Sequence, residues 1–263
     1  MEPKHRLARV VACLGLAFLG VTAAHAEYRY RHHAAGLAEA PKAPSVPAVT
    51  TPAQLKDFGG YRGWEDGTYA ASCLSYLNGD SAHSYGGATG SGVYRINLNS
   101  VPTSVYCDMA FEGGGWTLVR RTKAGTAWFP LSDNLAGSSY GTYVADPVAN
   151  ATFSLAYSGL SFSEFSFKTG DAAKWLIVNK GQVSILGDCS TRAHTVKKSH
   201  VSSTPYTVAW CNRTIRAEDP WISVYDHLTA ESDTHSMLYG ENGWTTNWTK
   251  WLSTRNGANV WVR

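Results

Sequence analysis

The chain has 263 residues and a formal net charge of +3, and 44% of its residues are hydrophobic. It is long enough for one domain with a substantial core, and its near-balanced charge argues against a nucleic-acid-binding protein, which needs a clustered basic face. The two adjacent basic pairs, Arg120–Arg121 and Lys197–Lys198, are too short to form a basic tract. We expect both pairs at the solvated surface.

The first 26 residues have the pattern of a secretory signal peptide. Three basic residues precede an apolar run over 10–24, and Ala24-His25-Ala26 offers small residues where signal peptidase cuts, which predicts cleavage before Glu27. A membrane anchor is the alternative, but the run is shorter than the roughly 20 residues that span a bilayer. The sequence therefore predicts a secreted or periplasmic protein whose mature chain has no membrane span.

Residues 27–55 are rich in alanine and proline and show no apolar periodicity. Such a segment is typical of a semi-flexible tether. The His32–His33 pair within it could bind a metal, but two adjacent histidines in a tail rarely form a site alone. The remaining residues, 56–263, are expected to form a single domain.

Apolar residues at helical spacing between Asp66 and Gly79 predict a short helix that carries Cys73. Residues 93–96 and 104–107 alternate in a way that predicts two paired strands. Further short strands are predicted at 116–119, 153–157, 165–167, 175–178, 183–186, 206–210 and, at the end of the chain, 259–263. The pattern indicates a β-rich domain with few, short helices.

The most distinctive segment is 106–118, with the sequence YCDMAFEGGGWTL. Three successive glycines between apolar runs predict a turn, a bulge or a ligand loop, because glycine tolerates positive φ and close backbone approach. We interpret Asp108 and Glu112, which flank the triplet, as a turn-forming acid and a solvent-facing strand end.

Together with Ser72-Cys73-Leu74 and residues 91–96, this segment resembles the opening of the fibrinogen C-terminal domain, whose bacterial members carry the signature Y-C-D-x4-G-G-G-W-T-L. The resemblance covers residues 72–121, and the predicted final strand is similar to one in intelectin-like lectins. It implies an α+β fold with a β-rich mixed or antiparallel sheet, few short helices, long loops and disulfide bonds.

Export would leave four cysteines in an oxidising compartment, and this even number predicts two disulfides. The four are Cys73, Cys107, Cys189 and Cys211. Three pairings are open to the sequence alone; the resemblance favours Cys73 with Cys107, which leaves Cys189 with Cys211. Zinc binding is the rival interpretation, but the spacings are too wide for a zinc finger and no C-x-x-C pair is present.

Polar and aromatic residues concentrate in 221–244, which we interpret as the functional loop. In fibrinogen-like and intelectin-like proteins the late region holds calcium, a cation that takes oxygen ligands. The resemblance implies Asp226, Glu231 and Asp233 as the calcium ligands. A solvated acidic loop explains these residues equally well, because EF-hand spacing is absent. Zinc bound through His227 and His235 is disfavoured, because they lack the H-E-x-x-H spacing.

The chain has ten tryptophans. Trp116, Trp175 and Trp210 lie in apolar strand contexts and are predicted to fill the core. Trp221, Trp244, Trp248 and Trp251 lie among polar residues, where such rings could stack on a sugar, enclose an acetyl group or lie in a protein interface. The predicted ligand-contacting residues are Tyr225, His235, Tyr239, Trp244 and Trp248.

No P-loop or dinucleotide-binding motif is present, and the paired cysteines leave no thiol nucleophile. We therefore expect a non-catalytic domain that binds an extracellular glycan or an acetylated ligand, with calcium as its cofactor. A surface or matrix module that binds a cell-surface protein is the alternative. An exported hydrolase is the third possibility, because sequence spacing does not identify a glycosidase carboxylate pair. Glycosylation acceptor motifs begin at Asn150, Asn212 and Asn247.

Overall fold

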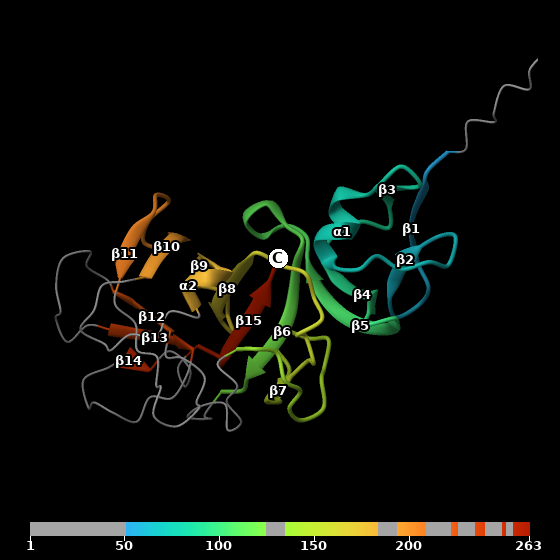
Figure 1. Ribbon diagram of the computed structural model, residues 1–263. Coiled ribbons are helices and arrows are strands. Elements are labelled where there is room, and N and C mark those ends of the chain that lie inside the picture. Colours follow the sequence, from blue (N-terminus) through green and yellow to red (C-terminus); the bar gives the residue numbers. More distant parts are fainter. Residues whose placement is uncertain are drawn as a thin grey trace, which may run out of the picture. The chain divides into compact units, whose positions relative to one another are not determined.

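The computed structural model describes residues 51–124, 135–183, 194–208, 222–225, 235–239, 249–250 and 255–263 (Figure 1). All of them belong to one compact unit, Val49–Arg263. Its first strand begins at Ala53, so the ordered domain starts slightly before the predicted end of the tether at residue 55. Among the described residues, no helix has the length and apolar character needed to cross a membrane.

Within the described part of the chain, the main sheet has twelve strands. They are β1 (Ala53–Asp57), β2 (Arg62–Trp64), β3 (His83–Gly87), β4 (Gly92–Leu98), β5 (Val101–Asp108), β6 (Trp116–Thr122), β7 (Phe153–Ser154), β8 (Glu164–Thr169), β9 (Trp175–Asn179), β10 (His194–Ser199), β11 (Tyr206–Val208) and β15 (Ala258–Val262). Their order is β11-β10-β9-β8-β15-β6-β5-β4-β2-β1-β3, with β7 paired to β6. The sheet is mixed, because β1 with β3 and β2 with β4 run parallel.

The smaller sheet holds β12 (Ile222–Tyr225), β13 (His235–Tyr239) and β14 (Thr249–Lys250). The helical elements are α1 (Cys73–Asn78), the 3-10 turn η1 (Phe111–Gly113) and α2 (Lys180–Val183). This strand-rich mixed sheet with few short helices confirms the expected fold class.

The N-terminal half of the domain follows local sequence signals. Strands β4 and β5 form the predicted hairpin, whose two connecting residues, Asn99 and Ser100, both have positive φ, as a tight hairpin turn requires. The predicted helix is α1: Ser72 caps it by accepting a hydrogen bond from the Ser75 amide at 3.1 Å, and Gly79, with φ of 61°, ends it.

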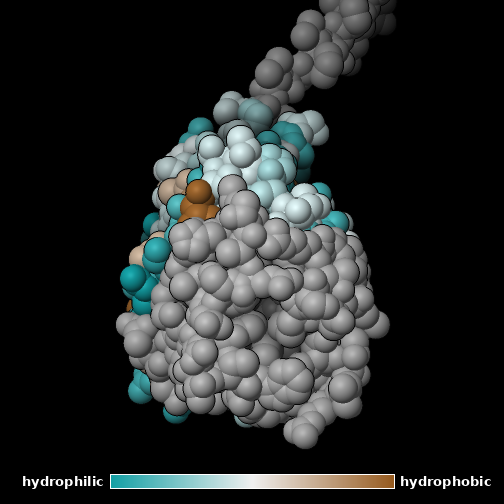
Figure 2. All heavy atoms as spheres, turned by 90° about the vertical axis from the view of Figure 1, so that its left-hand side faces the viewer, coloured by the Kyte–Doolittle hydropathy of each residue, from teal (hydrophilic) through white to brown (hydrophobic). Residues whose placement is uncertain are grey.

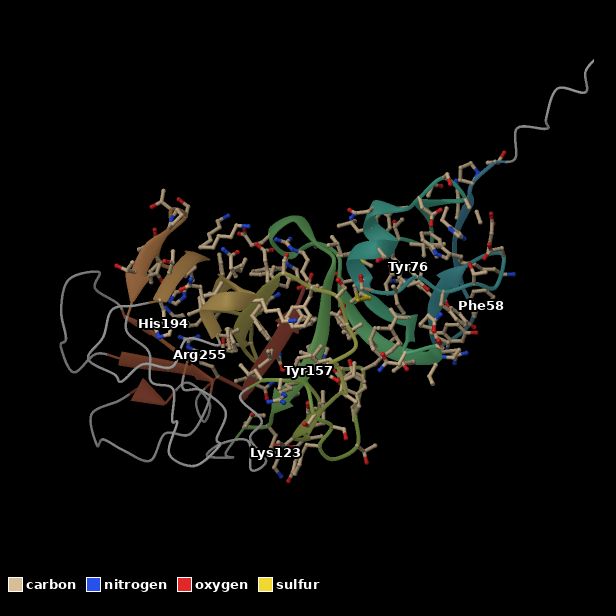
Figure 3. The ribbon with its side chains drawn as sticks, in the orientation of Figure 1. Phe58, Tyr76, Lys123, Tyr157, His194 and Arg255 are labelled. Atoms are coloured by element: carbon tan, nitrogen blue, oxygen red, sulfur yellow. A yellow bond between two sulfur atoms is a disulfide. The ribbon has the colours of Figure 1, made fainter. Side chains whose placement is uncertain are left out.

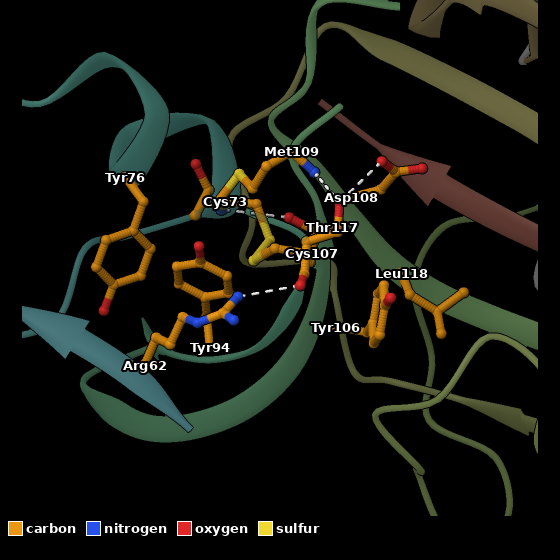
Figure 4. The surroundings of a disulfide bond; sticks show 12 residues. Arg62, Cys73, Tyr76, Tyr94, Tyr106, Cys107, Asp108, Met109, Thr117 and Leu118 are labelled. Atoms are coloured by element: carbon orange, nitrogen blue, oxygen red, sulfur yellow. Dashed lines mark hydrogen bonds between the residues drawn. A yellow bond between two sulfur atoms is a disulfide. The ribbon is translucent and has the colours of Figure 1, made fainter. Parts of the chain in front are cut away.

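The disulfide between Cys73 and Cys107 joins α1 to β5, with 5.5 Å between the two Cα atoms (Figure 4). Both cysteines are fully buried, and the rings of Tyr76 and Tyr94 pack beside each other nearby, 5.2 Å apart. This pairing confirms the one that the resemblance favours. Cys189 and Cys211 lie outside the described residues, so the second disulfide stays a prediction.

The last strand of the chain lies in the middle of the main sheet. Val260 of β15 is the register partner of Arg120 on β6 and of Phe167 on β8 (Figure 1). All five residues of β15 are buried. The predicted closing strand is therefore confirmed, and it completes a sheet whose neighbouring strands are far apart in sequence.

Apolar side chains cover both faces of the central strands. Val119 and Val260 belong to the larger hydrophobic cluster, whereas their sequence neighbours Leu118 and Trp261 belong to a smaller one. Because successive strand residues point to opposite faces, this alternation places a cluster on each side of the sheet. On the face shown in Figure 2, the described residues are mostly hydrophilic or intermediate in hydropathy.

Two of the three core predictions for tryptophan can be compared with the structure. Trp116 is fully buried, which confirms the prediction. Trp175 is half-buried and packs against the smaller cluster. Trp210 lies outside the described residues.

The expected surface position of Arg120 and Arg121 is wrong, because both side chains are fully buried. They lie on β6, which is covered on both faces. Arg120 donates a hydrogen bond to the Ser154 hydroxyl at 2.9 Å. Arg121 donates to the Asn259 side chain at 3.0 Å and to the carbonyls of residues 147, 149 and 256. Burial lowers the pKa of Arg121.

Two predicted strands are shorter than expected or differ in type. Of the strand predicted at 153–157, only Phe153–Ser154 forms a strand, β7. The prediction of a strand at 183–186 is wrong at Val183, which ends the helix α2. The other three residues lie outside the described part of the chain.

Two hydrogen bonds fix the turn of the chain after β9. The Lys180 amide donates to the Ser163 carbonyl at 2.7 Å, and the Gln182 side chain accepts from the Thr195 amide at 2.7 Å.

Candidate functional site

The structure places the backbone of three predicted ligand-contacting residues on the β12–β13 hairpin. Tyr225 ends β12 and His235 begins β13, and the two are register partners. Tyr239 ends β13 and is the register partner of Ile222. The hairpin therefore brings Tyr225 and His235 together and puts Tyr239 at its other end.

The other residues of the predicted site lie outside the described part of the chain. They are the calcium ligands Asp226, Glu231 and Asp233 and the aromatic residues Trp244 and Trp248. Across the described ranges, no group of three or more histidine, cysteine, aspartate or glutamate side chains could hold a metal ion. The calcium site stays a prediction.

Two central strands of the main sheet support the hairpin. Strand β13 lies close to β8 and β15. Both β8 and β15 are buried along their whole length. The two strands that lie close to β13 are thus fully buried parts of the main sheet.

The glycine triplet forms a turn beside this framework. Gly113, Gly114 and Gly115 all have positive φ, between 75° and 90°. A Cβ atom at Gly114 would lie 2.3 Å from the Met109 carbonyl oxygen, and one at Gly115 would lie 3.0 Å from the Leu74 Cα. The triplet is therefore required both for its backbone conformation and for close approach of the turn to α1, as predicted.

An ion pair fixes the start of this turn. The Asp108 carboxylate accepts hydrogen bonds from the Ala110 and Phe111 amides at 3.2 and 3.0 Å, which confirms its predicted role in the turn. It also binds the ammonium of Lys168 at 2.9 Å. The Lys168 ammonium lies 3.3 Å from the centre of the Phe111 ring and 4.7 Å from that of Trp261.

Burial and the ion pair shift the pKa of each of these two groups in opposite directions. Only 2% of the Lys168 side chain is exposed. Burial lowers the pKa of Lys168 to about 8, although Asp108 counteracts it. Burial would raise the pKa of Asp108, but Lys168 and the two turn amides outweigh it and lower that pKa. Each charge therefore depends on the other.

The last residue of the chain fixes the end of the turn. Arg263 binds Glu164 through two nitrogen atoms, at 3.0 and 2.6 Å. It also donates to the carbonyl oxygens of Glu112 and Gly114, at 2.8 and 3.1 Å. Its guanidinium carbon lies 4.3 Å from the centre of the Trp116 ring. The final residue thus connects β8 to the glycine turn.

Two surface lysines complete this charge network. Lys197 pairs with Glu164, and Lys198 pairs with Glu112. Both lysines keep substantial exposure, 54% and 37% of the side chain, so their predicted surface position is confirmed. The interpretation of Glu112 as a strand end is wrong, because it lies inside η1 with φ of 46°.

Sequence reasoning did not single out Lys168, Glu164 or Arg263. One signal was present: Lys168 follows the apolar run Phe165-Ser166-Phe167, where a lysine interrupts a strand that is otherwise suited to burial. Such an interruption indicates either the end of a strand or a paired buried charge. The partner, Asp108, is 60 residues away in sequence, and no local pattern connects the two.

Part of the chain is similar to known fibrinogen-like proteins. Residues 79–136 match the model for the C-terminal globular domain of fibrinogen beta and gamma chains. Over 45 residues the chain is 47% identical to angiopoietin-4 of Bos taurus, a match that covers 16% of this chain and 9% of that protein. The matched segment thus spans less than a tenth of the length of this curated relative.

Solved structures of fibrinogen-like globe domains are also similar. The domain of human ANGPTL6 has a TM-score of 0.38 at 14% identity, over 74% of this chain and 96% of that one. The domain of human ANGPTL2 has a TM-score of 0.37 at 11% identity, over 74% and 98%. The segment that matches the fibrinogen model includes the β4–β5 hairpin, the glycine turn and Cys107, and over this segment the chain is similar to the fibrinogen C-terminal domain.

Proposed function

We propose that this domain is the non-catalytic recognition module of an exported protein, and that it binds an extracellular glycan or an acetylated ligand at the β12–β13 hairpin. The observation that carries the proposal is the register of that hairpin. Tyr225 and His235 form its last pair, so the ends of the intervening segment 226–234 start from neighbouring positions. The residues with the most ligand chemistry are in this segment or next to it.

Calcium is part of the proposal. Asp226, Glu231 and Asp233 carry carboxylate oxygens, the ligand type that calcium prefers. Asp226 follows Tyr225 directly, and Asp233 precedes His235 by two residues, so both are close in sequence to the paired ends of β12 and β13. A bound cation would hold the segment in one conformation and would orient aromatic side chains toward a sugar.

The rigidity of the supporting strands favours this location for a binding site. Strand β13 lies close to β8 and β15, and the Lys168–Asp108 pair and the Arg121–Asn259 hydrogen bond fix those two strands to the rest of the sheet. A support that is already ordered reduces the conformational entropy lost on binding.

The test is an array of neutral glycans, acetylated ones included, probed with the purified full chain, once with calcium and once with a chelator. We expect binding that the chelator abolishes. The variants Asp226→Asn and Asp233→Asn should lose binding, whereas the matched acid-to-amide control Asp57→Asn, on β1, should keep it. Absence of a glycan signal in both buffers, from chains whose thermal unfolding is cooperative, would remove the lectin interpretation.

A protein-binding surface is the second candidate, and the loop between β6 and β7 favours it. Arg121 holds this loop by hydrogen bonds to the carbonyls of Pro147 and Ala149. Val144 and Val148 are nevertheless exposed, at 37% and 56%. Exposed apolar side chains that form a contiguous patch mark protein interaction sites, and this second candidate requires Val144 and Val148 to be part of such a patch.

The two candidates make different predictions for variants. The assay is capture of a protein from an envelope or matrix extract. The second candidate is favoured if excess free sugar does not prevent capture and the variant Val144→Ser/Val148→Ser loses it. Loss of capture in Trp244→Ala or Trp248→Ala, together with competition by sugar, would favour the first.

A further inference from the structure

The outer face of the N-terminal strands carries two stacked aromatic rings with a cation at each end. Lys56 of β1 and Gly63 of β2 are register partners on this face. Their neighbours Leu55 and Trp64 are buried on the opposite face. The outer face is thus distinct from the hydrophobic core of this region.

Two rings and two cations form a column on this face. The Lys56 ammonium lies 5.4 Å from the centre of the Phe58 ring. The Phe58 and Tyr61 rings are stacked, with their centres 5.3 Å apart and 13° between their planes. The Arg95 guanidinium lies 3.7 Å from the centre of the Tyr61 ring. Tyr69 meets Tyr61 edge-on at 6.2 Å. We call Lys56, Phe58, Tyr61 and Arg95 the aromatic column.

The backbone holds the column in place before any ligand arrives. The Phe58 amide donates to the Tyr61 carbonyl at 2.9 Å and closes the turn between β1 and β2. A Cβ atom at Gly63 would lie 3.1 Å from the Tyr69 ring and 3.6 Å from the Phe58 ring, so the rings pack directly over this glycine. Aromatic side chains fixed in this way lose little entropy when they bind a ligand.

The tyrosine hydroxyls are also part of this arrangement. The hydrogen bond with Tyr69 raises the pKa of Tyr61, and the same bond lowers the pKa of Tyr69. Attraction to Arg95 opposes the rise for Tyr61 and adds to the fall for Tyr69. The Arg95 guanidinium also lies 5.8 Å from the centre of the Tyr69 ring, so Tyr69 belongs to the same end of the column.

The charges of the column are not neutralised within the described part of the chain, where neither Lys56 nor Arg95 has a carboxylate within 4.0 Å. In that part, five other cations have such a partner: Lys168, Lys197, Lys198, Arg255 and Arg263. The two acids nearest to Lys56 in sequence make other hydrogen bonds, because Asp57 accepts from the Gly59 amide and Glu65 from the Gln54 amide.

We propose that the aromatic column binds an acidic polysaccharide, one that carries sulfate or carboxylate groups along an extended chain. The two cations at the ends of the column would each bind an oxyanion. The ring edges between them carry partial positive charge and offer an apolar surface to the sugar. Phe58 is 37% exposed, and the column needs no metal ion. This site is separate from the β12–β13 hairpin and from its calcium.

The experiment is a calorimetric titration of the full chain with a heparin-derived oligosaccharide in the presence of a chelator. We expect binding that weakens between about 50 mM and about 500 mM salt, because screening weakens contacts between exposed charges. Neutral dextran should not bind. Binding by dextran, or equal affinity at both salt concentrations, would overturn the proposal.

Single variants locate the site. Lys56→Gln and Arg95→Gln should each weaken binding by about two- to fivefold, the range expected for one exposed ionic contact. Lys123→Gln, which makes the same change of charge at an exposed residue far from Phe58 in Figure 3, should bind like the parent chain. Lys56 is exposed and outside the core, so its variant tests the site even if Arg95→Gln unfolds. Equal affinity of the parent chain and Lys56→Gln would overturn the proposal.

Two further probes identify the source of the anion. Polyglutamate that binds as tightly as the oligosaccharide would indicate an acidic protein partner and would overturn the assignment to a polysaccharide. Vesicles with anionic lipid that bind more tightly would overturn it in favour of a membrane surface. Because the chelator is present throughout, failure of the calcium-dependent site leaves this result unchanged.

Discussion

Cations in the N-terminal strands and cations in the centre of the sheet are accommodated in opposite ways. Lys56 and Arg95 lie against ring faces on an outer surface. Lys168 and Arg121 are buried, and oxygen atoms of distant segments surround their nitrogens. Strands β1, β2 and β4 have one covered face, whereas β6 and β8 are covered on both. A charge in a strand covered on both faces cannot reach water, so it is stable only where the fold supplies a partner.

Two aspartates with the same local hydrogen bond test most directly whether burial of the partner cation decides the cost of losing a charge. Asp57 and Asp108 each accept a hydrogen bond from the amide two residues later, but only Asp108 also binds a buried lysine. Asp108→Ala should lower the free energy of unfolding by about 4 kcal/mol, because it leaves Lys168 buried and unpaired. Asp57→Ala should change it by no more than about 0.5 kcal/mol. Urea denaturation of the oxidised chain measures both.

The double variant Asp108→Ala/Lys168→Met separates the charge from the turn. Replacement of both partners removes the unpaired ammonium and should restore a large part of the lost stability. If the double variant is as unstable as Asp108→Ala alone, the turn amides rather than the ion pair account for the effect.

A second pair of variants compares the glycine turns of the two regions. Gly59 and Gly114 have similar φ, 77° and 75°. A Cβ atom at Gly59 would meet nothing within 4 Å, whereas one at Gly114 would lie 2.3 Å from a backbone oxygen. Gly114→Ala should therefore cost about 3 kcal/mol, and Gly59→Ala about 1 kcal/mol. Equal shifts in the urea midpoint at unchanged slope would show that backbone conformation alone decides the cost.

The same division explains which parts of the fold the sequence predicts. The β4–β5 hairpin, the cap at Ser72 and the glycine turn depend on residues a few positions apart, so local patterns are sufficient. The burial of Arg121 depends on Asn259, 138 residues away, and on carbonyls in two loops. An adjacent arginine pair has the same local pattern at a surface and in a core, and only the cover provided by distant strands separates the two cases.

The candidate site was predicted less completely than the fold. The sequence identified a polar and aromatic segment, and the structure adds that Tyr225 and His235 are paired while Tyr239 lies at the other end of the hairpin. Their pairing depends on strand register, which residue composition does not specify. The aromatic column illustrates the same limit, because Lys56 and Arg95 are far apart in sequence and come onto one face only through the pairing of β1, β2 and β4.

The smallest expected change in stability concerns His83, a histidine on β3. His83 lies between the carboxylates of Asp66 and Asp80, at 3.1 and 2.9 Å, and stacks on the Trp64 ring at 4.8 Å. Burial would lower the pKa of His83, but hydrogen bonds to Asp80 and Asp66 outweigh it and raise that pKa above its usual 6.5. Hydrogen bonds with Thr68 lower the pKa of Asp66, and the bond with His83 lowers that of Asp80.

These directions define a pH window. A raised histidine pKa contributes stability that is complete below pH 6.5 and is lost as the pH rises through the higher value of the folded state. The lowered pKa values of the two aspartates contribute stability that is complete above about pH 4 and is lost in more acidic solution. Thermal unfolding should therefore show a loss of less than about 1 kcal/mol from pH 6 to pH 8, since the cluster is partly exposed. His83→Gln should lose this dependence, whereas Lys123→Gln, at an exposed residue directly after β6, should retain it; an unchanged pH profile in His83→Gln would assign the titration to another group.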